Sequence, residues 1–187
     1  KIIKETMKKF KIFLFLLCEI NNKYLAEFRN HLQNLFGLDV ELTSHSVDLS
    51  FAYNERRRQY SGEEILRKAE KNKRNPDEKW LLIVDVDLYS SGLNFIFGLA
   101  NPYSGTSIIS LTRLRQQFYG KPENEKLFIE RLKKEATHEL GHLFYLGHCL
   151  DKKCVMHFSN SLYDTDVKSA YFCERCKKLL FNIKKGE

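Results

Sequence analysis

Proline and glycine are scarce in this chain, which has 3 and 9 of them among its 187 residues. This scarcity excludes a collagen-like protein and a linker-rich one. No apolar run approaches the roughly 20 residues that a membrane-spanning helix needs, and there is neither an internal repeat nor a low-complexity segment. Because domains typically hold about 100–200 residues, we expect a single domain over 1–187.

Apolar and aromatic residues are abundant. Hydrophobic residues make up 43% of the chain and aromatic residues 13%, with 14 Phe and 9 Tyr, so the chain can bury a core and is not wholly disordered. Lys and Arg number 31 against 24 Asp and Glu, a net charge of +7 spread along the sequence. This excess permits an anionic partner such as nucleic acid or a membrane surface but does not require one.

Four of the five cysteines fall between Cys149 and Cys176, and only Cys18 lies elsewhere. An odd number of cysteines in a chain of this size argues against a secreted disulfide scaffold. Clustered thiols beside a histidine-rich stretch indicate metal binding in a reducing compartment. We therefore expect a cytoplasmic protein.

The N-terminal region has the basic-then-apolar look of a signal peptide, with lysines after Met7 and an apolar run over 12–18. The run is short, Glu19 follows it directly, and no small-residue cleavage site is present. We therefore interpret 12–18 as a buried strand. Residues 1–6, before Met7, are either an expression remnant or the product of an alternative start.

The remaining pattern alternates strands and helices, which predicts an α/β sheet in the first two-thirds of the chain. Asn22 is the predicted cap of a helix that ends at Gly37, and Ser61 is the predicted start of a second helix. The predicted strands are 12–18, 39–43, 80–87, 95–99 and 107–111, and the predicted helices are 22–36, 61–71 and 124–143, with a charged loop over 71–77.

Two charged groups have a structural and a functional interpretation. Arg56, Arg57 and Arg58 could contact phosphates, but a run of charge in a polar segment favours a solvated loop. Asp85 and Asp87 could act as a carboxylate pair, but their place near the end of a strand favours a structural role.

The stretch 138–148 reads HELGHLFYLGH. On a helix, residues four apart share a face, so His138 and His142 can both direct an imidazole at one ion, and Glu139 can reach its open side. His148 can be the third ligand if the helix ends before it. Three such ligands leave one position on zinc for a water molecule. Zinc lowers the pKa of that water to about 7. Glu139 can take the proton of the water during its attack on a peptide carbonyl. The same histidines could instead be ordinary surface residues of a helix.

A second constellation follows at once. Cys149 and Cys154 form one pair, and Cys173 and Cys176 form another. Four thiolates make a closed tetrahedral zinc site, which is structural and cannot be catalytic. The alternative of four unrelated buried cysteines is disfavoured by the close pairing. Since His148 and Cys149 are adjacent, one turn must deliver a ligand to each of the two sites.

The combined pattern, with Cys154-x-Met156 after the histidines, resembles the archaemetzincins, a branch of the metzincin zinc peptidases. Segments 85–89, 92–98 and 110–115 are also similar to that family, so the resemblance extends from about Met7 over nearly the whole chain. It implies an α/β (α+β) fold with a mixed twisted sheet over an active-site helix (about 7–148), and a small C-terminal subdomain (149–187) holding a zinc ion on four cysteines. It also implies that Met156 forms the turn beneath the catalytic metal, whereas the residues alone indicate an ordinary core methionine.

Two positions depart from the family pattern. Tyr145 stands where metzincins place a glycine that ends the helix, so Tyr145 either adopts a left-handed conformation or lets the helix run on to Gly147 and pulls His148 away. We expect the first outcome, because the strain is small beside the energy of a metal bond. The spacing between Met156 and Cys173 is one residue shorter than usual, which we place in a loop over 159–165.

The sequence thus predicts a zinc-dependent metallopeptidase with two zinc ions, one catalytic and one structural. We expect a monomer that acts on peptide or protein substrates, with no membrane or nucleic-acid partner. An extended peptide would add to an exposed edge strand, for which we select 107–111. One rival is an inactive zinc-binding interaction module. A second is a nucleic-acid-binding zinc protein that uses the basic residues Lys177, Lys178, Lys184 and Lys185.

Overall fold

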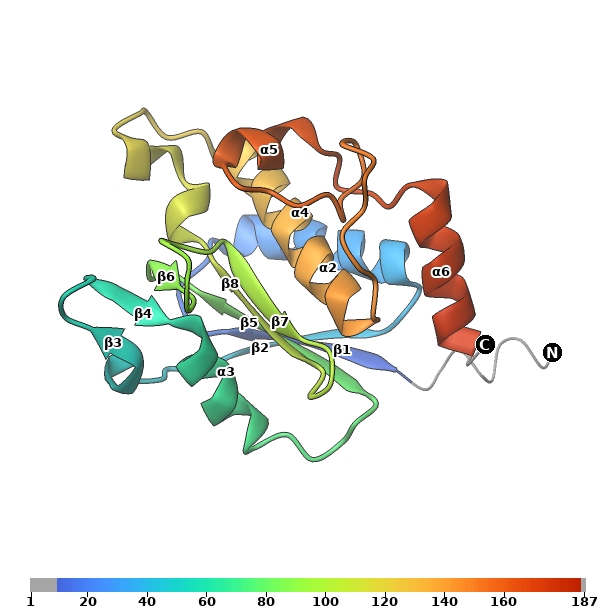
Figure 1. Cartoon of the computed structure of the whole chain (residues 1–187), viewed down its shortest axis with the longest axis horizontal. Helices are drawn as coiled ribbons and strands as arrows, with labels where there is room; N and C mark the ends of the chain where they lie inside the picture. Colours follow the sequence, from blue (N-terminus) through green and yellow to red (C-terminus); the bar gives the residue numbers. More distant parts are fainter. Residues whose placement is uncertain (1–9, 186–187) are drawn as a thin grey trace.

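A computed structural model describes residues 10–185 and shows a five-stranded sheet in the order β2-β1-β5-β8-β7. Four strands are parallel and β7 is antiparallel, so the expected mixed sheet is confirmed. Helices α2 and α4 cover one face and α3 covers the other (Figure 1). The sheet strands are β1 (Lys11–Leu16), β2 (Val40–Ser44), β5 (Glu78–Val84), β7 (Gly98–Asn101) and β8 (Thr106–Ser110), and the helices are α2 (Asn22–Phe36), α3 (Gly62–Glu70), α4 (Glu125–Leu143), α5 (Leu162–Val167) and α6 (Glu174–Lys185).

Alternation of side chains places the core on both faces of the sheet. Along β1, Ile12, Leu14 and Leu16 face α2 and α4, while Phe13 and Phe15 lie on the α3 side and are less buried. This confirms that the apolar run is a buried strand, although the strand ends at Leu16 rather than residue 18. Lys8 and Lys9, the lysines between Met7 and β1, lie outside the described residues.

Side-chain caps fix the helix ends close to the predicted positions. Asn21, not Asn22, caps α2 by accepting a hydrogen bond from the Lys23 N–H, and Gly37 ends that helix with φ 60°. Ser61 caps α3, and Asn124 caps α4. The cap of α2 is one residue earlier than predicted because the two asparagines are adjacent and either one can supply the capping oxygen.

The predicted strand 80–87 is too long at its end. β5 stops at Val84, and Asp85 and Asp87 then turn toward arginines: Arg115 Nη2 lies 3.0 Å from Asp85, and Arg113 holds both oxygens of Asp87 at 2.6 and 2.8 Å. The structural interpretation of the two aspartates is therefore confirmed. These ion pairs carry the chain away from the sheet and end the strand.

The selection of 107–111 as the exposed edge strand is wrong. β8 lies between β5 and β7, and all five of its residues are buried. Its serines resemble the polar, solvent-facing residues of an edge strand. Their hydroxyls are buried instead, because Ser107 Oγ donates to the Trp80 carbonyl and Ser110 Oγ donates to the Val86 carbonyl. The two edge strands are β2 and β7, and the one next to β8 is β7, predicted over 95–99 and observed over Gly98–Asn101.

A second, smaller sheet was not predicted. It contains β3 (Tyr53–Asn54), β4 (Gln59–Ser61) and β6 (Leu88–Tyr89). The three-arginine run forms the turn between β3 and β4 and is exposed, as expected for a solvated loop. Arg57 does more than face solvent, because its Nη2 donates to the carbonyls of Leu93 and Asn94 at 2.8 and 3.0 Å.

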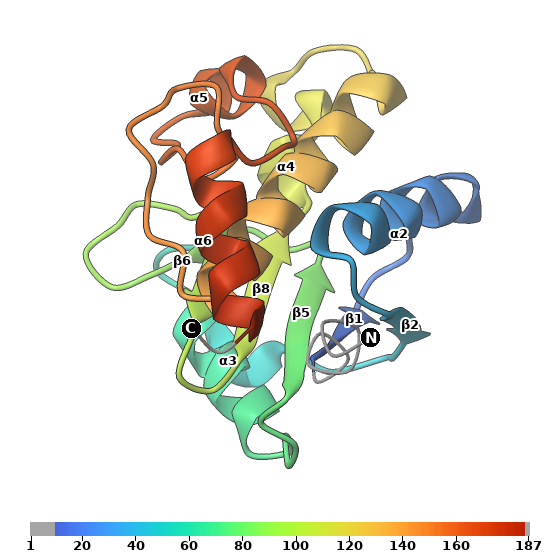
Figure 2. The same cartoon turned by 90° about the vertical axis from the view of Figure 1, so that its right-hand side faces the viewer.

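The C-terminal helix α6 packs on the end of α2 and α4 (Figure 2). Lys184 is buried, and its Nζ donates to the Phe36 carbonyl. One of the four lysines assigned to the nucleic-acid rival is therefore unavailable to phosphates. In the described part of the chain, no helix is long and apolar enough to cross a membrane.

Candidate functional site

Helix α4 carries the first two histidines, and its end determines where the third lies. The helix stops at Leu143, and Tyr145 takes the left-handed conformation with φ 58°. The Leu146 N–H then donates back to the Gly141 carbonyl at 3.1 Å. The first of the two outcomes expected for Tyr145 is the observed one, since the chain reverses there and returns His148 to the helix.

The three imidazoles converge on one point. Their candidate ligand atoms all lie within 4.8 Å of one another, and the Nε2 atoms of His138 and His142 are 3.1 Å apart. Each of these two rings uses Nδ1 to donate to a backbone carbonyl at 2.8 Å, Val155 for His138 and Leu146 for His142. A carbonyl only accepts, so Nδ1 holds the proton and Nε2 presents a lone pair to the shared point.

Burial keeps these ligands neutral. Desolvation lowers the pKa of His138 well below its ordinary value and also lowers the pKa values of His142 and His148. Three neutral imidazole nitrogens around one point are a donor set that zinc accepts, with a fourth position left open. The donor set therefore fits a catalytic zinc ion.

Glu139 lies beside the histidines, packed against the edge strand. Burial raises the pKa of its carboxyl well above the ordinary value, and the charge of Glu135 adds to that effect. The close approach depends on Gly98 of β7, where an added Cβ would lie 2.6 Å from both Cγ and Oε1 of Glu139. A glycine at this position lets the carboxylate lie between the histidines and the rim of the cleft.

Met156 is fully buried directly behind the helix. A Cβ added at Gly141 would lie 2.4 Å from the Met156 Sδ, so the helix and the methionine are in close contact at a position where only glycine fits. Val155, the residue before Met156, holds His138 through its carbonyl. Met156 and the residue before it thus pack against the part of α4 that carries His138 and His142.

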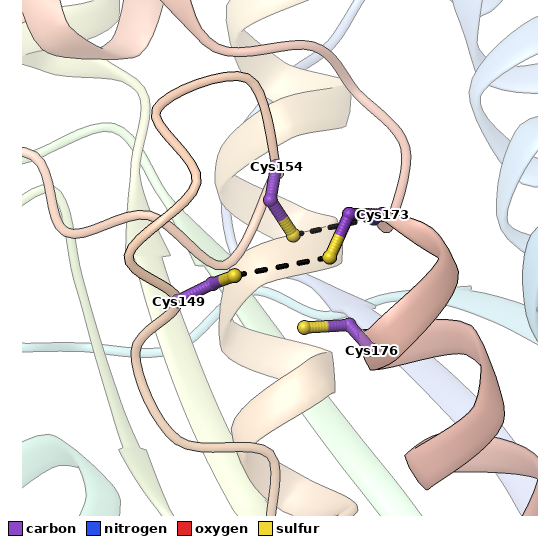
Figure 3. Close-up of side chains that lie close together, drawn as sticks. All are labelled: Cys149, Cys154, Cys173 and Cys176. Carbon is purple, nitrogen blue, oxygen red and sulfur yellow. Dashed lines mark hydrogen bonds between the residues drawn. The ribbon is translucent and has the colours of Figure 1, made fainter.

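The four clustered thiols form a separate group. Cys149 and Cys154 come from the loop after α4, and Cys173 and Cys176 come from the start of α6 (Figure 3). Their sulfur atoms lie within 4.8 Å of one another, with Cys149 Sγ 3.8 Å from Cys173 Sγ. The sulfurs point toward a common centre, an arrangement that suits a closed tetrahedral zinc site.

The pKa values of the clustered thiols shift in different directions. Burial raises the pKa values of Cys154 and Cys176. Burial also opposes ionisation of Cys173, but hydrogen bonds from the Cys176 backbone and from neighbouring thiols outweigh it and lower its pKa. A bound dication would favour the thiolate form of all four.

The histidines and Glu139 open onto a cavity of about 460 Å³ bounded by β7 on one side and residues 158–168 on the other. The sequence predicted that second wall as a loop over 159–165. The structure instead forms α5 over Leu162–Val167, capped by Ser161, and ion pairs fasten it to α4. Lys168 and Ser159 line the cavity there, and no motif in the sequence indicated either residue.

Known proteins match this chain over most of its length. The model of peptidase family M54 matches residues 1–182. A protein named archaemetzincin from Thermococcus kodakarensis is 44% identical over 166 residues, which cover 86% of this chain and 89% of the relative.

Solved structures also match. A zinc-dependent peptidase from Methanocorpusculum labreanum has a TM-score of 0.85 at 30% identity, covering 90% of this chain and 99% of that chain. An archaemetzincin from Methanopyrus kandleri has a TM-score of 0.80 at 33% identity, covering 93% of this chain and 94% of that chain.

Proposed function

The chain belongs to peptidase family M54, the archaemetzincins, and is a zinc metallopeptidase; we propose that Glu139 is the general base of its peptide-bond hydrolysis. The observation that carries the proposal is the meeting of three histidine nitrogens within 4.8 Å of one another beside this buried carboxyl. A zinc ion held there would supply Lewis-acid chemistry, polarising water and the scissile carbonyl.

The residues around the ion have separate tasks. His138, His142 and His148 would hold it, each through a neutral ring nitrogen. The Glu139 carboxylate takes a proton from the attacking water and passes it to the leaving amine. Burial raises the pKa of this carboxyl, and the field of a neighbouring dication would favour its ionised form.

The edge strand β7 is the element that can align a substrate. It forms one rim of the cavity and, within residues 10–185, pairs with a neighbouring strand only on its β8 side. An extended peptide added to the free edge of β7 would run beside the strand, along the cavity that Glu139 and the histidines line. We therefore propose that the substrate binds to β7 (Gly98–Asn101) and not to 107–111.

We also propose that a second zinc ion is held by Cys149, Cys154, Cys173 and Cys176. This site has four ligands and no open position, so its task is structural. It holds the loop after α4 to the start of α6, two segments that otherwise meet through few backbone hydrogen bonds.

Cleavage of a mixed peptide library tests the activity. Zinc-loaded protein should release products that mass spectrometry detects, a chelator should abolish them, and added zinc should restore them. Cleavage that continues in chelator would reject the role of the histidine site. Absence of cleavage at full zinc loading would favour the inactive interaction module.

A further inference from the structure

Two polar atoms in the wall of the catalytic cavity have no use in the chemistry described above. Ser159 Oγ is buried and has no hydrogen-bond partner among the described residues, and Lys168 Nζ is buried beside Glu135, with which it forms an ion pair. Both residues line the cavity that contains the three histidines and Glu139. Buried polar atoms whose hydrogen-bonding capacity is not filled are costly, so a hydroxyl without a partner and an ammonium with a single ion pair in one cavity require an explanation.

Lys168 is the more informative of the two. Its side chain is 0% exposed, and its Nζ lies 3.0 Å from Glu135 Oε1. The same Glu135 oxygen accepts a hydrogen bond from Thr165 Oγ1 at 3.1 Å. An ammonium group has three N–H donors, so Glu135 offsets much of its charge and still leaves donors free for a further acceptor.

The surrounding elements hold this lysine in place. Arg131 of α4 binds both carboxylate oxygens of Asp166 at 2.7 Å, and Lys134 Nζ donates to the Asp166 carbonyl at 3.0 Å. These contacts fix the end of α5 on α4, two residues before Lys168. The ammonium therefore lies at a set depth in the cavity wall that faces β7.

We propose that Lys168 and Ser159 form an anion-binding subsite that receives a carboxylate of the peptide substrate and so determines specificity. The inference rests on the proposed peptidase function of the same cavity. The ammonium and the hydroxyl would both donate to the carboxylate. A peptide supplies that group from an Asp or Glu side chain near the cleaved bond, or from its free C-terminus.

The competing explanation is that the Lys168–Glu135 pair only holds α5 against α4. The two explanations differ in one measurable quantity, the preference for a carboxylate over its amide. A structural pair affects the stability of the protein but does not change this preference. A subsite lysine changes the preference because the amide carries no charge for it to bind.

Two pairs of matched peptides measure the preference with the zinc-loaded full chain. The first pair carries Glu or Gln next to the cleaved bond and has an amidated C-terminus. The second pair has identical residues with a free or amidated C-terminus. We expect kcat/KM to favour the carboxylate by about tenfold or more in one pair, and that pair identifies the source. Equal rates within both pairs would overturn the proposal.

Variants then assign the preference to the subsite. Lys168→Met should abolish it and Ser159→Ala should reduce it. Glu135→Gln should increase it, because the ammonium loses its competing partner. Lys152→Met removes an exposed lysine outside the cavity and should leave the preference unchanged. A preference that survives in Lys168→Met would overturn the proposal, and if that variant fails to fold, unchanged preference in both Ser159→Ala and Glu135→Gln would do so.

Binding separates this proposal from the proposed function. Fluorescence anisotropy of the same labelled peptides with zinc-loaded Glu139→Gln protein reports recognition without turnover. Tighter binding of the carboxylate peptide supports the subsite even if no peptide is cleaved by the parent protein. Equal binding of acid and amide would reject the subsite while leaving any observed peptidase activity standing.

Discussion

At the scale of single residues, Gly98 has the clearest consequence. Its substitution by Ala would place a Cβ 2.6 Å from Cγ and Oε1 of Glu139, so the carboxylate must move. Because a displacement of about 1 Å at a reacting group can cost 10²-fold in rate, we expect Gly98→Ala to lower kcat by about that factor. Steady-state kinetics on a cleaved peptide would measure the loss.

The matched control for this prediction is Gly147→Ala. An added Cβ there meets nothing within 4 Å, although Gly147 is adjacent to His148. We expect its kcat to stay close to that of the parent. Equal losses in the two variants would show that Gly98 acts through general disturbance of the cleft rather than through Glu139.

Glu139 itself should be separable from metal binding. Glu139→Gln keeps the size of the side chain but removes the base, so activity should fall by about 10²- to 10⁴-fold. Zinc content, measured by elemental analysis after dialysis, should match the parent because this residue is not a ligand. Retained activity would eliminate the proposed base.

Tyr145 is held in a conformation that glycine adopts without strain. A non-glycine residue at φ 58° costs about 1 kcal/mol or somewhat more, and glycine relieves that cost while adding freedom to the unfolded chain. We expect Tyr145→Gly to change peptidase activity little and to leave zinc affinity unchanged or slightly tighter. A gain in zinc affinity of about a hundredfold, roughly 2.7 kcal/mol, would contradict a complete site in the parent.

The sequence predicted the convergence of the histidines because helical spacing places His138 and His142 on one face. It could not predict Gly98, Ser159 or Lys168, since their positions follow from tertiary contacts between β7, α4 and α5. The spacing of the cysteines likewise predicted their grouping, which depends only on two short pairs being brought together.

At the scale of elements, the strongest contact between α5 and α4 is an ion pair with two hydrogen bonds. Arg131 is 3% exposed and binds both oxygens of Asp166, which is 33% exposed. Asp166→Asn leaves the guanidinium without its carboxylate, so the free energy of unfolding should fall by about 1.5–3 kcal/mol. Urea denaturation followed by circular dichroism would measure the change.

An exposed acid-to-amide substitution provides the comparison. Glu64 pairs with Arg67 on the surface of α3, and both side chains are largely exposed. Glu64→Gln should cost less than about 1 kcal/mol. A similar cost in both variants would show that Asp166 makes no special contribution to docking α5.

The interiors of most elements and the capped ends of the helices could be predicted from the sequence, whereas the ends of the strands could not. β5 ends three residues before the predicted boundary because Asp85 and Asp87 pair with arginines distant in sequence. The edge position was assigned to β8 rather than β7 because strand order is a property of the whole sheet. Short elements such as α5 and the β3–β4–β6 sheet lack enough residues for a periodic signal.

At the scale of the whole molecule, metal content tests the proposal of two ions. Carefully prepared protein should contain two zinc ions per chain, and the ion at the cysteines should resist a chelator for longer because that site is closed. Cys173→Ser should remove one ion and lower the thermal midpoint. A single ion in the parent, together with unchanged stability in Cys173→Ser, would reject the second site.

The adjacency of His148 and Cys149 makes the two proposed sites a linked equilibrium. His148 and Cys149 each supply a ligand to a different site. The Cys149 N–H also donates to the Met156 carbonyl at 2.9 Å, which fixes this segment to the one that contains Met156. Occupancy of either site then raises the affinity of the other by the same factor, typically about 5- to 150-fold. Oxidation of the thiolates by an external oxidant such as a peroxide would expel one ion and weaken binding of the other, so the redox state of four sulfurs outside the cleft would influence its activity.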